Sequence, residues 1–539
     1  MKNIYKFFIG SLLLGITSCS NDFIDIEPQS YITESIYFSN TEELNTALFA
    51  CYAGMRAPAE EEWKFTELRS DNAVLNQIAT TSVDNILFLS YDAFFINTID
   101  PNLSRFWFFN YVNIKNTNIL LDKMNVNYKE GSIVYGDNTI DATEDDIKDV
   151  ASQASFLRAY HYFNLVRLFG DVFLVTEPTS PVEATALTRV DKALVYDLII
   201  ADLQNTITNG NSARYSNITD ANAGRANAWS AKALLAKVYL TLGRKTDALP
   251  LLTDIIANSG YGLESTYKDV FSINNELNKE ILFTIRYKSG EGYLGSPFTT
   301  SFAPALPTRD SNGVPIFVVS NQGDNAPGQE LLDSFITDPV VDSLAPITSP
   351  DIRRSFILPS RDTSTPQKLF YTKYWYSLSV RDDSEFDFPI IRYADVLLMY
   401  AEAAGNSNPN TLTYMNQVRA RAGLTGANAL TTADIDTPAE FEMALSNERR
   451  WEFTAENHRW YDILRYGTTT TTLNAVDIME NHFTEIHPLL YAFFTQNAED
   501  VTLPILLERV DENSLLLPIP QIELDLDSEG DFNQNPGYN

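Results

Sequence analysis

Apolar residues recur at helical spacing along most of the chain, and the pattern is clearest in residues 225–258. Two apolar runs there are separated by Gly243, which supplies a turn. The repeating positions are Leu235, Ala236, Tyr239, Ala248, Leu252 and Ile255. This pattern predicts two helices packed as a hairpin, in which the small side chains of Ala236 and Ala248 let the helix axes approach closely.

The same spacing predicts further helices in residues 106–124, 151–169, 191–207, 390–404 and 412–422. A small and then an aromatic position on one helix, a glycine turn and a second apolar run are typical of tetratricopeptide-like helix pairs. We therefore expect a mostly α fold, with a solenoid-like scaffold of helix pairs.

Two long, irregular and turn-rich inserts, about 75–105 and about 260–390, separate these helix pairs. Loops of that length inside a compact domain are usually functional. Short strand patterns lie in the second insert at 280–287, 313–319 and 367–377, so minor β elements should decorate the helical body. The proline-containing stretch 515–539 should run extended over the surface.

The N-terminus carries Lys2 and Lys6, then an apolar run over 7–16, then Cys19. About ten apolar residues are half of the roughly 20 that cross a bilayer as a helix, so this segment indicates a targeting signal. Small residues before Cys19 indicate a relaxed lipobox, which predicts a lipoprotein signal peptide at 1–18 and lipidation of Cys19. The alternative is an ordinary secretory signal that happens to contain a cysteine.

Charge and cysteine content fit an exported protein. The formal net charge is -32, which speaks against nucleic acid as a partner because phosphate binding needs a basic surface. The second of the two cysteines, Cys51, lies in an apolar helical stretch and should be buried. No linker composition interrupts the chain after Ser20. We expect one domain over 19–539, with parts at about 19–260, 260–390 and 390–539.

Catalytic patterns are weak. The closest histidine pair reads HFTEIH, whose spacing of five cannot place both rings on one helix face as a zinc site requires. With 71 acidic residues, a pair of carboxylates at glycosidase spacing carries no information. The charged set Arg449, Arg450, Glu452, Glu456, Arg459 and Asp462 indicates a paired structural network. We predict no metal, no cofactor and no catalytic residue.

Aromatic residues in the inserts are the candidate binding groups, since aromatic rings stack on the apolar face of a sugar or receive the side chains of a peptide. Arg69 and Asp71, at the edge of the first insert, are the candidate polar contacts, with an intramolecular ion pair as the alternative. For each ring, the alternative is a loop anchor packed on the scaffold. The aromatic candidates are Tyr91, Phe94, Phe95, Tyr287, Tyr293, Trp375 and Tyr376, with Phe298 and Phe302 nearby.

Several segments together resemble the SusD/RagB family of outer-membrane nutrient-binding lipoproteins. The resemblance is strongest in QASFLRAYHYFNLVRLFGDVFLVTEP (153–178), GRANAWSAKALLAKVYL (224–240), PIIRYADVLLMYAEA (389–403) and ERRWEFTAENHRWYDILRYG (448–467). It implies a SusD-like α/α superhelix and a non-enzymatic protein at the cell surface. Such a protein would bind an oligomeric nutrient, preferably a glycan, in a shallow aromatic site.

The resemblance also implies partners: a SusC-like TonB-dependent transporter that receives the nutrient, and the outer membrane, reached through the lipid anchor. Alternatives remain open. Within binding proteins, the RagB-like branch implies peptide capture. A surface glycosidase with an unfamiliar site and a purely structural envelope protein are the rivals from other classes.

Overall fold

The computed structural model describes residues 38–539, apart from the following: 76–82, 220–221, 291, 293, 303–307, 310–314, 317–323, 339–347, 360–365, 367, 377, 379, 496, 528–531 and 539. The predicted signal peptide and Cys19 lie outside the described residues, and so does Tyr293.

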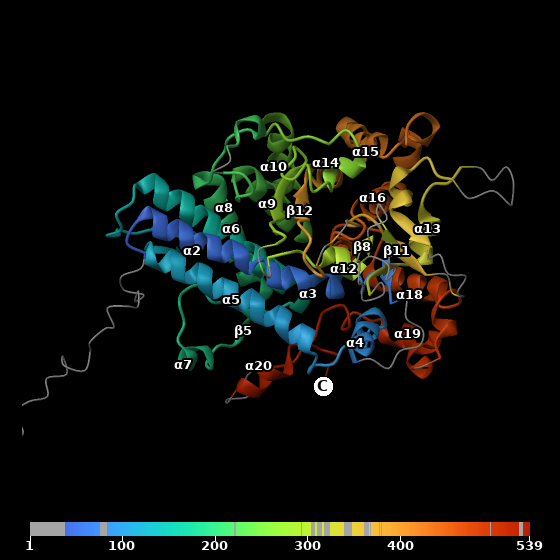
Figure 1. The fold of residues 1–539 in the computed structure, drawn as a ribbon, viewed down its shortest axis with the longest axis horizontal. Coiled ribbons are helices and arrows are strands. Elements are labelled where there is room, and N and C mark those ends of the chain that lie inside the picture. The colour runs from blue at the N-terminus through green and yellow to red at the C-terminus, as the bar shows by residue number, and fades with distance from the viewer. Residues whose placement is uncertain are drawn as a thin grey trace, which may run out of the picture.

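Long helices pack in a continuous row, which forms the helical body of Figure 1. Along the row each helix packs against the next, although α14 is separated from α10 by more than 130 residues of sequence. The members in order are α5 (Pro101–Lys123), α6 (Glu144–Phe169), α8 (Lys192–Asn209), α9 (Ala228–Thr241), α10 (Lys245–Asn258), α14 (Tyr393–Ala404) and α15 (Pro409–Arg421). α2 (Thr41–Gly54) packs on α5 and α6, and α16 (Pro438–Glu452) packs on α14 and α15. The predicted scaffold of helix pairs is confirmed.

The hairpin predicted in 225–258 is the pair α9–α10, and its repeating positions are buried as expected. Asn227 caps α9, because its side chain accepts hydrogen bonds from the backbone N–H groups of Trp229 and Ser230. Gly243 makes the turn with φ +71°, a conformation that a residue with a side chain rarely adopts.

The first insert is more regular than predicted. It contains the helix α4 (Val83–Asp92), whose Phe88, Leu89 and Tyr91 are buried. α5 also begins earlier than expected, at Pro101, because Asp100 caps it and proline suits the first helical position. Irregular structure over the whole of 75–105 was therefore a wrong expectation.

Short strands pair in the described part of the chain as six antiparallel two-stranded sheets. The second insert contributes β6 (Ile281–Ile285), β8 (Pro315–Ile316) and β11 (Leu369–Tyr371), each inside a predicted strand but shorter than it. The sheets are β1 (Ala73–Val74) with β9 (Ala326–Pro327), β2 (Val126–Lys129) with β3 (Ser132–Tyr135), β4 (Val172–Phe173) with β5 (Arg189–Val190), β6 with β12 (Phe388–Arg392), β7 (Thr308–Arg309) with β8, and β10 (Ile357–Pro359) with β11.

Shorter helices fill the space around the body, and the C-terminal stretch is not wholly extended. Leu517 and Ile519 are buried, and the stretch then forms α20. The shorter helices are α3 (Arg56–Thr66), α7 (Pro181–Ala184), α11 (Tyr267–Val270), α12 (Phe298–Phe302), α13 (Gln329–Ser334), α17 (Arg459–Arg465), α18 (Ala475–Ile486), α19 (Leu503–Arg509) and α20 (Gln521–Leu526).

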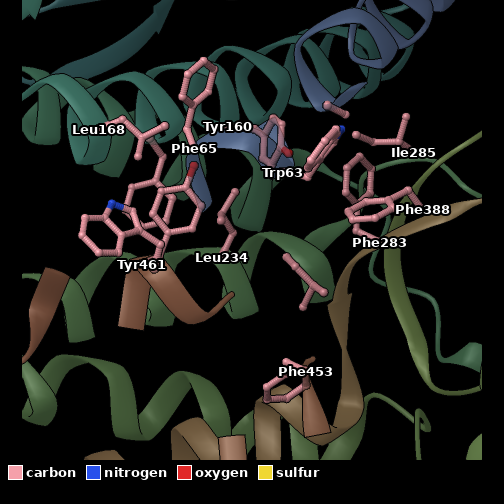
Figure 2. Packing of buried hydrophobic residues seen from close by; sticks show 14 of the residues in the cluster. Trp63, Phe65, Tyr160, Leu168, Leu234, Phe283, Ile285, Phe388, Phe453 and Tyr461 are labelled. Atoms are coloured by element: carbon pink, nitrogen blue, oxygen red, sulfur yellow. The ribbon is translucent and has the colours of Figure 1, made fainter. Parts of the chain in front are cut away.

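One connected hydrophobic core extends from Leu44 to Phe532 and includes Cys51, which is buried as predicted. Residues from both halves of the sequence meet in it, as Figure 2 shows. The labelled side chains there are Trp63, Phe65, Tyr160, Leu168, Leu234, Phe283, Ile285, Phe388, Phe453 and Tyr461.

The predicted charge network is also confirmed, and it is buried. Arg392 donates to Glu456 (2.6 Å) and to Glu280 (2.6 Å), so it ties the second insert to the C-terminal helices. Arg449 joins Asp395 of α14 to Asp462 of α17 at 2.8 and 2.7 Å. Buried charges need such pairing, since removing one partner leaves an uncompensated charge in the interior.

Candidate functional site

Several aromatic residues of the two inserts form one connected cluster of rings. Trp63 of α3 contacts Phe302 of the second insert at 5.6 Å between ring centroids and Phe88 of the first insert at the same distance. Neighbouring rings in the remainder of the cluster lie 4.5–6.0 Å apart. Each ring contacts the next in the series Tyr287, Phe298, Phe302, Tyr374, Phe386 and Tyr376. Four of the predicted aromatics of the second insert, Tyr287, Phe298, Phe302 and Tyr376, therefore converge.

Most of these rings are interior. Tyr91 is fully buried, and its hydroxyl donates to the carboxylate of Asp100 at 2.7 Å. Tyr287 is buried beneath Phe298, and Phe94 is buried against Trp460 at 5.6 Å. Buried rings cannot stack on a ligand unless the core opens. Tyr91, Phe94 and Tyr287 are thus loop anchors in this structure, the alternative that the sequence left open.

Arg69 and Asp71 are buried as well. The carboxylate of Asp71 accepts from Arg459 at 2.7 and 2.8 Å and pairs with Arg450, so the ion pair is intramolecular but does not involve Arg69. Burial opposes ionisation of Asp71, yet the two guanidinium groups hold its pKa well below the usual range. The Arg69 guanidinium lies 4.5 Å from the centre of the Phe94 ring. Neither side chain is available to a ligand.

Three predicted residues remain half-exposed: Phe95, Trp375 and Tyr376. The Phe95 ring is covered on one side by the guanidinium of Arg509, 4.4 Å from its centre. Trp375 and Tyr376 follow β11 in a turn, and the Tyr376 ring stacks on Phe386 at 5.9 Å with an interplanar angle of 21°. Among the described aromatics predicted for binding, Trp375 and Tyr376 form the adjacent pair that reaches the surface.

Charged groups that the sequence did not single out lie beside this pair. Arg286 donates to Glu276 at 3.1 Å and also pairs with Asp387. Glu276 and Asp387 line one small pocket together with Phe386, on which the Tyr376 ring stacks. Burial and the Glu276 carboxylate raise the pKa of the Tyr376 hydroxyl. We call Trp375, Tyr376, Glu276, Arg286 and Asp387 the Tyr376 site.

The β6–β12 pairing assembles the Tyr376 site, because it brings Arg286 at the end of β6 next to Asp387 at the start of β12. The Tyr287 backbone N–H also donates to Asp387 at 2.8 Å. Burial raises the pKa of Asp387 to about 7, and Arg286 opposes that rise. The sequence carried no signal for this pairing, because Arg286 lies inside the predicted strand 280–287 whereas β12, which follows Asp387, was not predicted as a strand.

Within the described residues, no group of three or more histidine, cysteine or acidic side chains is placed to hold a metal ion. His482 Nδ1 instead lies 2.7 Å from a Glu330 carboxylate oxygen. No helix in the same part of the chain is long and apolar enough to cross a bilayer.

Comparison with known proteins matches both halves of the chain to one family. Residues 359–538 match the model described as the SusD family. Residues 22–240 match a second SusD-like model, described as starch-binding associating with outer membrane. The chain belongs to the SusD family. This membership confirms the resemblance seen in the sequence motifs. The description of the second model associates the family with the outer membrane.

Relatives of this SusD-family protein align over nearly their whole length. A SusD-like protein of Formosa agariphila is 25% identical, over 95% of this chain and 97% of the relative. A SusD-like protein of Bacteroides ovatus is 24% identical, over 85% of this chain and 81% of the relative.

Solved structures share its fold. A laminarin binding SusD-like protein superposes with a TM-score of 0.68 and 25% identity, covering 93% of this chain and all of the other. The surface glycan-binding protein A from Bacteroides fluxus gives a TM-score of 0.69 at 20% identity, covering 92% of this chain and 99% of the other. The SusD-like helical fold predicted from the motifs is therefore confirmed.

Proposed function

We propose that this protein is a non-enzymatic cell-surface lipoprotein that binds a glycan and delivers it to a SusC-like TonB-dependent transporter. The observation that carries the binding role is the Tyr376 site, where two half-exposed aromatic side chains adjoin a charged trio. Family membership supports the glycan, since the relatives named for a ligand are named laminarin binding and glycan-binding.

The chemistry of the Tyr376 site suits a sugar. A pyranose presents C–H groups on its faces, which pack on an aromatic ring, and hydroxyls at its edge, which hydrogen-bond with charged groups. Arg286 supplies donors and Glu276 supplies acceptors, while the buried Asp387 pairs with Arg286 and holds its guanidinium in place. In this proposal Trp375 and Tyr376 hold the ring, and the trio fixes its orientation. Tyr293 stays a proposed contact from the sequence.

The anchor and the delivery step rest on the sequence and the family. Lipidated Cys19 would hold the protein at the outer membrane, as each acyl CH₂ buried in lipid contributes about 0.8 kcal/mol. Bound glycan would then pass to the transporter that the protein covers.

A binding panel tests this function. The soluble chain of residues 20–539 would be titrated with laminari-oligosaccharides, malto-oligosaccharides and short peptides. We expect retention of one oligosaccharide class, and about tenfold weaker binding in the double variant Trp375→Ala, Tyr376→Ala because the stacking surface is lost. The matched control is Phe49→Ala, which removes a half-exposed ring from α2.

The same panel separates the rival functions. Retention of peptides alone would favour the RagB-like alternative. Asp387, whose pKa is about 7, could remain protonated near neutral pH as a glycosidase acid does. Time-dependent release of shorter sugars that stops in Asp387→Asn would therefore make the protein an enzyme and overturn the binding-only proposal. No retention of any ligand would favour a structural envelope protein.

A further inference from the structure

A large apolar cavity lies on a part of the surface that the Tyr376 site does not use. It has a volume of about 490 Å³ and opens between α5, β4, α7 and α20. In Figure 1, α7 and α20 lie along the lower edge of the molecule, away from α12 and β11. Aromatic and aliphatic side chains line most of the cavity: Trp107, Phe108, Tyr111, Phe173, Leu526 and Phe532.

The rim of the cavity leaves large apolar side chains in solvent. Phe108 on α5 and Leu526 on α20 both line the cavity, and each is 57% exposed. Ile522, one turn before Leu526, is 59% exposed. Ile99 extends this apolar strip, because its neighbour Thr98 accepts a hydrogen bond from the backbone N–H of Gln521 at the start of α20. Exposed apolar residues gathered around a cavity mark interaction sites.

The polar groups around the cavity are mainly acidic. Glu177, Glu523 and Asp527 line it, whereas Lys115 is the one basic side chain of its lining. This imbalance matches the chain as a whole, whose net charge is -32. An occupant with positive charge next to an apolar group would complement both features.

Neutral hydrogen-bond donors of the lining are already engaged. The Tyr111 hydroxyl donates to the carbonyl of Phe173 at 3.0 Å, and the Trp107 indole is hydrogen-bonded to Glu523. Inside the cavity, Trp107 and Phe173 meet edge to face at 81°. The neutral donors of the lining are therefore already paired, and the inner rings Trp107 and Phe173 do not form one flat platform for a sugar.

We propose that this surface, defined by Ile99, Phe108, Ile522 and Leu526 around the cavity, docks a polypeptide partner. The partner inserts a large apolar side chain flanked by lysine or arginine. A polypeptide fits better than a small molecule because exposed apolar side chains continue beyond the cavity, at Ile522 on α20 and at Ile99 just before α5, as they do at interfaces. The partner assigned to this surface is the SusC-like transporter, an assignment that rests on the proposed function.

Co-purification tests the docking surface. The lipidated full chain would be purified from outer membranes of its host, and the SusC-like transporter that accompanies it would be quantified. We expect Phe108→Glu and Leu526→Glu each to reduce the accompanying transporter at least tenfold, because a carboxylate cannot enter the apolar contact beside acidic neighbours. Met443→Glu on α16 is the matched control, since Met443 is 50% exposed elsewhere.

Charge and folding controls complete the experiment. Glu177→Lys is expected to lower the transporter yield as well, and rising salt should weaken the wild-type complex. Each variant should keep the wild-type circular dichroism spectrum and glycan affinity. A wild-type transporter yield in both Phe108→Glu and Leu526→Glu would overturn this surface while leaving the proposed function intact. Failure of the wild-type chain to accompany any transporter would overturn both the docking surface and the delivery step.

Discussion

Glu67 illustrates how burial sets the chemistry of single residues in this protein. The residue is fully buried, and its carboxylate accepts a hydrogen bond from the backbone N–H of Asn457 at 2.6 Å. Burial nevertheless raises its pKa to about 7, because the backbone hydrogen bonds and the positive charge of Lys373 do not replace the lost hydration. The folded protein thus holds a proton at Glu67 that the unfolded chain releases near pH 4.5.

The raised pKa of Glu67 predicts a pH dependence of stability. Because the folded state binds more protons between pH 4.5 and 7, the contribution of Glu67 to the free energy of unfolding falls as pH rises through that window and is constant above it. Glu67→Gln keeps an acceptor for Asn457 and removes the titration.

Urea denaturation at pH 5 and pH 8 measures this effect. On going from pH 5 to pH 8, the free energy of unfolding of Glu67→Gln should rise by on the order of 1–3 kcal/mol relative to that of wild type. The exposed Glu480→Gln serves as the control. Identical pH trends in wild type and Glu67→Gln would contradict the prediction.

At the scale of elements, close helix packing depends on small residues at the contacts. Ala236 of α9 and Ala248 of α10 are fully buried, and both helices pack on each other and on α14. The pair therefore joins the N-terminal helices to the C-terminal ones.

Overpacking this contact should loosen the scaffold. Ala236→Leu adds a branched side chain where the core is filled, so we expect a loss of about 1–3 kcal/mol in the free energy of unfolding. The matched substitution Ala257→Leu, at an exposed position of α10, should change stability by less than about 0.5 kcal/mol. Equal denaturation midpoints for the two variants would contradict this prediction, because the α9–α10 contact would then accommodate a larger side chain.

At the scale of the whole molecule, location and binding are separable. The lipid anchor is predicted at Cys19, whereas the Tyr376 site is built from β6, β12 and the turn after β11. Cys19→Ala should therefore leave the protein in the soluble fraction with unchanged glycan affinity. Fractionation of that variant with the outer membrane would place the anchor elsewhere.

Particular residues explain which parts of the fold and site could be predicted. The helices at 151–169 and 225–258 carry their periodicity locally, so their positions were predictable, and so was the pairing of Arg449 with Asp462 within their charged segment. Tyr91 and Phe94 were misjudged because an aromatic residue in an insert gives no local sign of the face it will pack on. Arg286 and Asp387 were missed because their contact spans about 100 residues.

The sequence by itself determined the helical scaffold, the acidic net charge and the family, and it predicts the export signal, since periodicity, composition and motifs are properties of neighbouring residues. Only the tertiary structure decided which aromatic rings became core and which reached solvent. It also decided that α5 and α20, hundreds of residues apart, share one apolar cavity. Burial and long-range pairing depend on how the whole chain packs, and this is why both sites emerge only in three dimensions.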